Sequence, residues 1–200
     1  MKHRNITRDW VYATVFGSLW GALEITLGAL IHALRIPLAG VWMAAAGVII
    51  LICGLMIYPR RGFALRVGLV CMLLKLVNPS IAFVLAAISI IMEAVAVEII
   101  IGDGRFGRLR AMLAGGVAVL MPFFQFLLYA LIIYGWDVVR VYYIGIQKML
   151  KWMAAPEVLG YGAVAAIIAG IFMIGVVSAL VGLRIGGAVL EHRENFDHVS

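Results

Sequence analysis

A glutamate, Glu24, lies inside the apolar stretch GSLWGALEITLGALIH near the start of the chain. A carboxylate in hydrocarbon is costly and usually faces a bundle interior or a water-filled cavity. If the apolar stretches are helices that rise about 1.5 Å per residue, Glu24, Ser89 and Gln125 each lie about nine residues from the outer end of their helix. These three polar groups therefore share one level in the outer half of the molecule.

Further polar residues fall near this level. They are His32, Arg35, Lys75, Asn78, Tyr129 and Arg140. An outward-opening pocket that binds a small solute accounts for all of these side chains together. The alternative is structural, with Glu24 in a buried pair with Lys75, or protonated and hydrogen-bonded to Gln125.

A second intramembrane carboxyl, Glu93, lies one helical turn deeper than Ser89, a distance of roughly 6 Å. It could form the floor of the pocket or pair with Arg66 near the inner face, and the sequence leaves both arrangements open. We therefore include Glu93 among the candidate solute-binding residues.

The charges around the expected pocket indicate a class of solute. The cations Arg35, Lys75 and Arg140 favour a solute with an anionic group. Glu24 favours a positive or hydrogen-bond-donating group on the same molecule. A zwitterionic or heteroaromatic, vitamin-like compound fits both conditions.

Motifs for other chemistry are weak. The chain has no HExxH motif and no cysteine pair at zinc spacing, and no nucleophile stands beside an oriented base. The loop GDGRFG lacks the lysine pattern of a nucleotide-binding loop. We therefore expect no enzyme activity, no metal and no cofactor in this chain, and any ATP must be used by a partner.

Composition places the chain in the membrane. The sequence is 65% hydrophobic and 13% charged, with a mean hydropathy of +1.10, whereas soluble domains have about 45–50% apolar and about 25% charged residues. The Lys and Arg residues fall between apolar runs, which indicates topology and lipid headgroups rather than nucleic acid. We expect a single transmembrane domain over residues 1–200.

The expected fold is an all-α bundle of six transmembrane helices. Its spans are predicted at about 9–33, 38–58, 63–77, 80–101, 111–134 and 156–183. Residues 136–153 alternate charges with aromatic and aliphatic side chains, which predicts an amphipathic helix in the membrane interface before the last span. The polar tail after the last span is expected to fray.

The distribution of basic residues predicts the orientation. Six spans put eleven of the sixteen Lys and Arg residues on the side that holds both ends of the chain. Because basic loops remain in the cytoplasm, both termini are predicted to be cytoplasmic. The polar level and residues 136–153 then lie outside.

Small residues form a stripe on the first span. Ala13, Gly17, Gly21, Glu24, Gly28 and His32 share one helical face. Small residues four apart allow a second helix to approach closely. The stripe could pack inside the bundle, or Ala13, Gly17 and Gly21 could form a docking face for a partner membrane protein. Glu24 shares this face, so serving both a partner and a pocket would require the helix to tilt or bend.

The layout resembles the substrate-binding S component of energy-coupling factor (ECF) transporters, the vitamin and micronutrient importers of prokaryotes. The stretches LWGALEITLGALIHALRIPLAG, GLVCMLLKLVNPS and PFFQFLLYALIIYGWDVVRVY also look like uncharacterised proteins assigned to that class. The resemblance covers the whole chain.

The resemblance implies a location and partners. It implies a multi-pass protein of the prokaryotic cytoplasmic membrane that works with a transmembrane scaffold subunit and ABC ATPases. The scaffold would contact an AxxxA motif, whose positions here are Ala13, Gly17 and Gly21, and the loop of residues 32–37 would cap the pocket. Nickel and cobalt members begin Met-His outside the cell, whereas this chain begins Met-Lys-His and is predicted to begin inside, which argues against those ions.

Two other functions remain open from the sequence. One is a self-contained transporter or channel that uses Glu24 and Glu93 as proton-linked carboxylates. The other is a membrane assembly factor or lipid-binding subunit without transport activity. The first would move solute without a partner, and the second would bind no polar solute.

Overall fold

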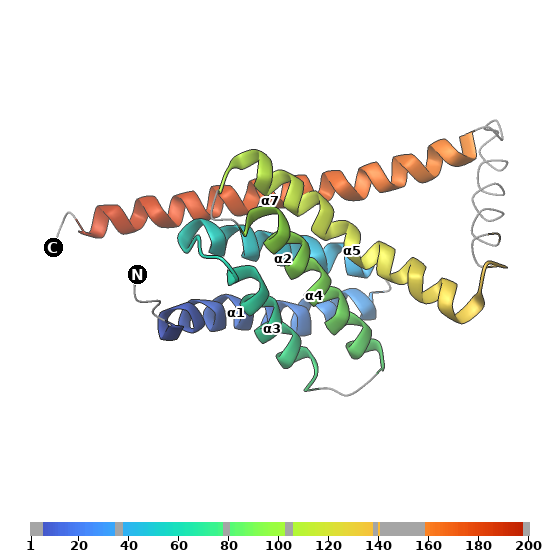
Figure 1. Cartoon of the computed structure of the whole chain (residues 1–200), viewed down its shortest axis with the longest axis horizontal. Helices are drawn as coiled ribbons and strands as arrows, with labels where there is room; N and C mark the ends of the chain where they lie inside the picture. Colours follow the sequence, from blue (N-terminus) through green and yellow to red (C-terminus); the bar gives the residue numbers. More distant parts are fainter. Residues whose placement is uncertain are drawn as a thin grey trace.

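The structure, a computed structural model, describes residues 6–34, 38–77, 81–102, 106–137, 140 and 159–197. This part of the chain is helical, and Figure 1 shows its helices packed side by side as an elongated bundle. The helices are α1 (Ile6–Ala33), α2 (Ala39–Ile57), α3 (Phe63–Lys75), α4 (Ile81–Ile101), α5 (Arg108–Tyr134) and α7 (Leu159–Asp197). Most of the predicted interfacial helix 136–153 lies outside the described residues.

Four of these helices are long and apolar enough to cross a membrane: Ile6–Ile31, Ala39–Ile57, Arg108–Ile133 and Val164–Arg193. They are compatible with a multi-pass membrane protein. Helix α3 has 13 residues, a length of about 20 Å, which is shorter than the roughly 30 Å hydrocarbon core. The all-helical prediction is confirmed, and the six-span bundle stays a prediction.

Most helix boundaries fall within a few residues of those expected, but the last helix does not. The predicted span ended at residue 183 with a frayed polar tail, and α7 instead continues to Asp197. The tail contains good helix formers such as Glu191 and Arg193 and has no proline to stop the helix. The prediction of a frayed tail is therefore wrong for residues up to 197.

Helix α2 forms the centre of the bundle. About 67% of its apolar span is buried, against 28% for the other three long helices. It packs on α1, α5 and α7, and more lightly on α3 and α4. Its fully buried Leu51 and Ile52 share the core with Trp20 and Phe63. This central position explains why α2 is apolar on every side.

The outer faces of the bundle carry large apolar side chains. On α1, α5 and α7 these include Trp10, Val15, Leu19, Leu30, Leu128, Ile132, Ile167, Met173 and Val177. A soluble protein would bury such a surface, whereas a lipid-facing helix exposes it to acyl chains. The exposed apolar faces thus agree with the composition.

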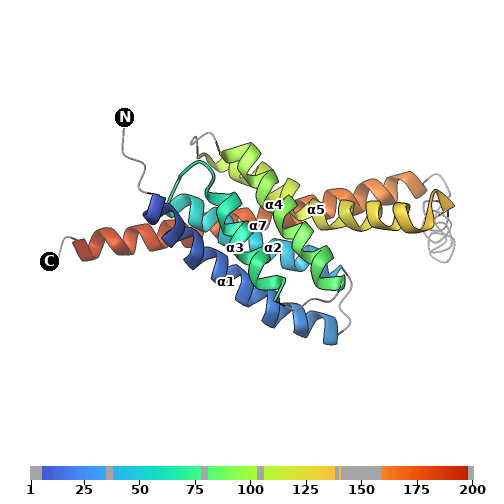
Figure 2. The same ribbon diagram turned by 60° about the horizontal axis from the view of Figure 1, so that its bottom comes forward.

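One end of the bundle is closed by polar contacts. Tyr58 donates a hydrogen bond to Asp9 Oδ1, and Arg66 Nη2 lies 3.7 Å from Asp9 Oδ2. Glu98 accepts hydrogen bonds from the backbone N–H groups of Gly62 and Ala64 at the start of α3. These contacts join α1, α2, α3 and α4 at the end where the chain begins. Figures 1 and 2 show α7 finishing at the same end.

Candidate functional site

A large cleft opens at the end of the bundle opposite to these contacts. Its volume is about 1170 Å³, and five helices line it. The contributing segments are the C-terminal half of α1, the start of α2, the end of α3, the middle of α4 and the second half of α5. The cleft therefore lies where the bundle spreads apart, and residues far apart in the sequence meet there.

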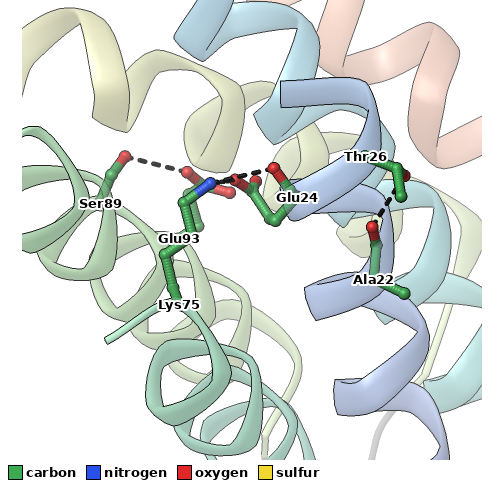
Figure 3. Close-up of polar contacts among 6 residues, drawn as sticks. All are labelled: Ala22, Glu24, Thr26, Lys75, Ser89 and Glu93. Carbon is green, nitrogen blue, oxygen red and sulfur yellow. Dashed lines mark hydrogen bonds and ion pairs between the residues drawn. The ribbon is translucent and has the colours of Figure 1, made fainter. Parts of the chain in front are cut away.

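The floor of the cleft holds a buried ion pair. Lys75 Nζ lies 2.8 Å from Glu24 Oε2 and also donates to the backbone carbonyl of Glu24 at 3.0 Å. Only 5% of Glu24 and 7% of Lys75 is exposed. Figure 3 shows both side chains pointing into the space between α1, α3 and α4. The pair joins the end of α3 to the middle of α1.

A second carboxyl lies beside this pair. Ser89 Oγ donates to Glu93 Oε1 at 3.0 Å, one helical turn away on α4. Glu93 is only 3% exposed. Its other oxygen, Oε2, is buried and has no hydrogen-bond partner among the described residues. Both Ser89 and Glu93 line the cleft, so an unsatisfied acceptor lies at its floor.

Helix α5 forms one wall of the cleft. Phe123, Gln125, Phe126 and Tyr129 face it from this helix. Pro122, also on this wall, cannot donate a backbone hydrogen bond to the preceding turn, which favours a bend in the helix. The rest of the lining is mainly apolar and comes from residues such as Ile25, Leu38, Val41, Met43, Leu74 and Ile90. The cleft is thus mainly apolar, and its charged lining residues Glu24, Lys75 and Glu93 are buried.

The structure brings together most of the predicted site residues. Glu24, Lys75, Ser89, Glu93, Gln125 and Tyr129 all line the cleft. Arg35, Asn78 and the side chain of His32 lie outside the described residues. Arg140 is exposed and is not among the lining residues, so its predicted place at the pocket is not observed. In the sequence it lies six residues after Tyr134, where α5 ends.

Two alternatives from the sequence are decided by these contacts. From the sequence, a solute pocket and a buried Glu24–Lys75 pair are alternative explanations for the intramembrane polar residues. The structure contains the ion pair, and the pair lines a cleft. Glu93 lies at the cleft floor, and the pairing with Arg66 is wrong, because Arg66 is near the other end of α3 and pairs with Asp9.

The small-residue stripe packs inside the chain. A methyl group added at Gly17 would lie 2.6 Å from Val70 Cβ, and one added at Gly21 would lie 2.7 Å from Leu74 Cδ1. Ala13 is fully buried. Internal packing, one of the two interpretations of the stripe, is therefore what the structure shows. A partner would reach Gly17 and Gly21 only if α3 moved away.

The same packing removes the need for a bend in α1. Glu24 and Gly28 face α3, as Gly17 and Gly21 do, and Lys75 Nζ lies 3.6 Å from the position of a Cβ at Gly28. The stripe therefore packs against α3 at Gly17 and Gly21. It reaches the cleft at Glu24 and Gly28, near the end of α3. Thr26, off this stripe, bonds to the Ala22 carbonyl of its own helix at 2.8 Å.

Sequence reasoning missed the contribution of α2. Leu38, Ala39, Gly40, Val41 and Met43 line the cleft. The sequence of α2 is apolar throughout and offers no period that would distinguish a cleft-facing side. A methyl group at Gly40 would lie only 3.1 Å from Pro122 Cβ, so a small residue is needed where α2 and α5 approach.

Comparison with protein-family models, with curated proteins and with solved structures finds no match to this chain. The geometry of the cleft and the chemistry of its lining are therefore the basis for any statement about function.

Proposed function

We propose that this protein captures a small organic solute in the five-helix cleft, as the membrane-embedded binding subunit of a solute importer. The observation that carries the proposal is the convergence of Glu24, Lys75 and Glu93 at the floor of an otherwise apolar cleft. Small-molecule sites are typically concave, apolar and supplied with a few placed polar groups, with volumes of about 300–1,000 Å³. At about 1170 Å³, the cleft has room for a vitamin-sized molecule.

The direction of capture follows from the charge pattern. The cleft lies at the end of the bundle opposite to the start of α1 and the finish of α7. The basic residues predict that this start and finish are cytoplasmic. Under that orientation the cleft opens to the outside of a prokaryotic cytoplasmic membrane, which is the direction that import requires.

We further propose coupling to a transmembrane scaffold subunit and ABC ATPases, as in the ECF S components that the sequence resembles. The chain carries no nucleotide-binding loop in its sequence, so energy from ATP would come through those partners. Because Gly17 and Gly21 pack against α3 and Ala13 is buried, we place the docking surface on an exposed face of the bundle instead. Reorientation of the whole subunit in the membrane would then release the solute inside.

A self-contained, proton-linked transporter is the second candidate. The buried Oε2 of Glu93, without a hydrogen-bond partner among the described residues, favours it. Intramembrane carboxyls of this kind occur in the proton relays of pumps and transporters. Glu24 and Glu93 are both buried and line the cleft from different helices, so the two carboxyls of such a relay would be α1 and α4 residues.

One experiment separates these functions. The tagged chain is captured from its native membrane in mild detergent, and the proteins and small molecules that come with it are identified by mass spectrometry. A scaffold, ABC ATPases and a retained metabolite would support the importer subunit. Recovery of the intact protein without protein partners, followed by solute uptake into liposomes that contain this chain only, would support the self-contained transporter.

A further inference from the structure

We propose that the cleft selects organic cations with an apolar body, and that Glu93 binds their positively charged group. This inference rests on the proposed solute-binding function and adds to it the class of solute. It concerns protonated amines and related N–H donors, joined to an aromatic or aliphatic portion that fills the apolar part of the cleft.

Carboxyl groups outnumber ammonium groups at the cleft floor. The cluster contains two carboxyls, Glu24 and Glu93, and one ammonium group, Lys75. Lys75 forms its 2.8 Å ion pair with Glu24 and a second hydrogen bond to the backbone of that residue. With all three groups ionised, the cluster has a net charge of −1. A bound cation brings that net charge to zero.

Glu93 offers an unsatisfied hydrogen-bond acceptor at the cleft floor. Glu93 Oε1 accepts a hydrogen bond from Ser89, and Oε2 has no partner within the described part of the chain. A buried polar atom without a partner is destabilising, and more so when it is charged. An N–H group of a ligand placed at Oε2 would remove this cost, whereas a ligand carboxylate would add a third negative group.

The rest of the cleft lining is mainly aromatic and aliphatic. The α5 wall supplies three aromatic rings, Phe123, Phe126 and Tyr129, and the other walls are mainly aliphatic. Such a surface favours an apolar body over a compact polar solute such as a sugar or an inorganic ion. Aromatic rings also attract cations through their π faces. A cation with an apolar body matches both parts of the cleft.

These contacts change the expectation drawn from the sequence. The cations Arg35, Lys75 and Arg140 favoured an anionic group on the solute. Lys75 is engaged by Glu24, and Arg140 is not among the residues that line the cleft. Arg35 lies outside the described residues. The lining that the structure describes therefore favours a positive group on the solute.

The test uses three radiolabelled probes of the same size and different charge: 4-phenylbutylammonium, 4-phenylbutan-1-ol and 4-phenylbutanoate. Binding to the full-length chain in phosphatidylcholine nanodiscs is measured by equilibrium dialysis at pH 7, with empty nanodiscs to subtract partition into lipid. We expect saturable binding of the ammonium probe, at least about tenfold tighter than that of the carboxylate. E93Q is expected to weaken ammonium binding about tenfold. E191Q, which changes an exposed carboxyl of α7, leaves it unchanged.

Each other outcome overturns a defined part of the proposal. Equal or tighter binding of the carboxylate or the alcohol would overturn the preference for cations and leave solute binding intact. Tight ammonium binding that E93Q does not weaken would overturn the role of Glu93. If none of the probes binds saturably to protein with an intact thermal unfolding transition, the proposed solute-binding function fails as well. If E93Q does not fold, the order of the three probes on the wild-type protein still decides the charge preference.

Discussion

The buried pair of Glu24 and Lys75 leads to a quantitative prediction about stability. The two side chains are almost fully buried, and their charged atoms are 2.8 Å apart. E24Q leaves an ammonium group at the cleft floor without its closest anion. K75M leaves two neighbouring carboxyls, Glu24 and Glu93, without this cation. Both variants keep the approximate size of the side chain, so the change is mainly one of charge.

The magnitude follows from the burial and the two hydrogen bonds. Removing one partner of a buried ion pair typically costs about 3–5 kcal/mol, because the other charge is left uncompensated. The pair lines a cleft, where the remaining group can turn toward water, so we expect the lower end, about 3 kcal/mol for K75M. E24Q should cost less, about 2 kcal/mol, since Lys75 keeps its bond to the Glu24 backbone carbonyl.

A double-mutant cycle isolates the interaction between the two residues. E24Q/K75M removes both charges, so it should cost less than the sum of the single variants by about 1–2 kcal/mol. The free energy of unfolding is measured by denaturant titration of the purified protein in mixed micelles. S178A is the control, because Ser178 bonds only to the Ile174 carbonyl of its own helix among the contacts described, and its expected cost is below about 1 kcal/mol.

Additive costs of the two substitutions would refute the predicted coupling between Glu24 and Lys75. If the double variant cost as much as the two single variants together, Glu24 and Lys75 would not be coupled, and the observed contact would contribute nothing to stability. A K75M variant that is as stable as wild type would equally contradict the assignment of a buried, charge-compensated cluster to the cleft floor.

Three further predictions concern other parts of the bundle. G17A should lower the melting temperature because its methyl group would lie 2.6 Å from Val70 Cβ, whereas G170A, with open space around it, should leave it unchanged or raise it slightly; equal effects would contradict the tight packing of α1 on α3. The hydrogen bond to Asp9 raises the pKa of Tyr58, which follows the end of α2. Its stabilising effect is therefore present below the ordinary tyrosine pKa and is lost as pH rises through the raised value, so Y58F should be less stable than wild type at pH 7 and this difference should shrink at high pH in thermal unfolding. E98A should speed hydrogen exchange of the first backbone amides of α3, because Glu98 accepts their hydrogen bonds; unchanged protection would argue against this cap.

Much of the site could be predicted because depth in a membrane helix follows from counting residues. The level shared by Glu24, Ser89 and Gln125 depends only on helical rise and on the positions of the helix ends. All three residues line the cleft. Ionisable groups in apolar stretches are also easy to recognise in a sequence. They occur there mainly where a buried partner compensates them or where they face a cavity. Glu93 was recognised on this ground and lies at the cleft floor.

The identity of neighbours was beyond the sequence. A helical stripe such as Gly17 and Gly21 shows that something approaches closely, but not whether a partner or the chain's own α3 does so. For the same reason Arg66 was a possible partner for Glu93, although it pairs with Asp9. Each of these contacts joins different helices, and their relative rotation is set by packing across the whole bundle.

Hydropathy and helical rise are local properties, so the sequence alone predicted helices apolar enough to cross a membrane, most of their ends, and a common level for several polar residues. The tertiary structure decided that Lys75 is neutralised by Glu24 and that Glu93 keeps one buried oxygen without a partner among the described residues. It also decided that the apolar start of α2 completes the cleft. These features depend on which helix faces which, and that is fixed by long-range packing rather than by any one segment.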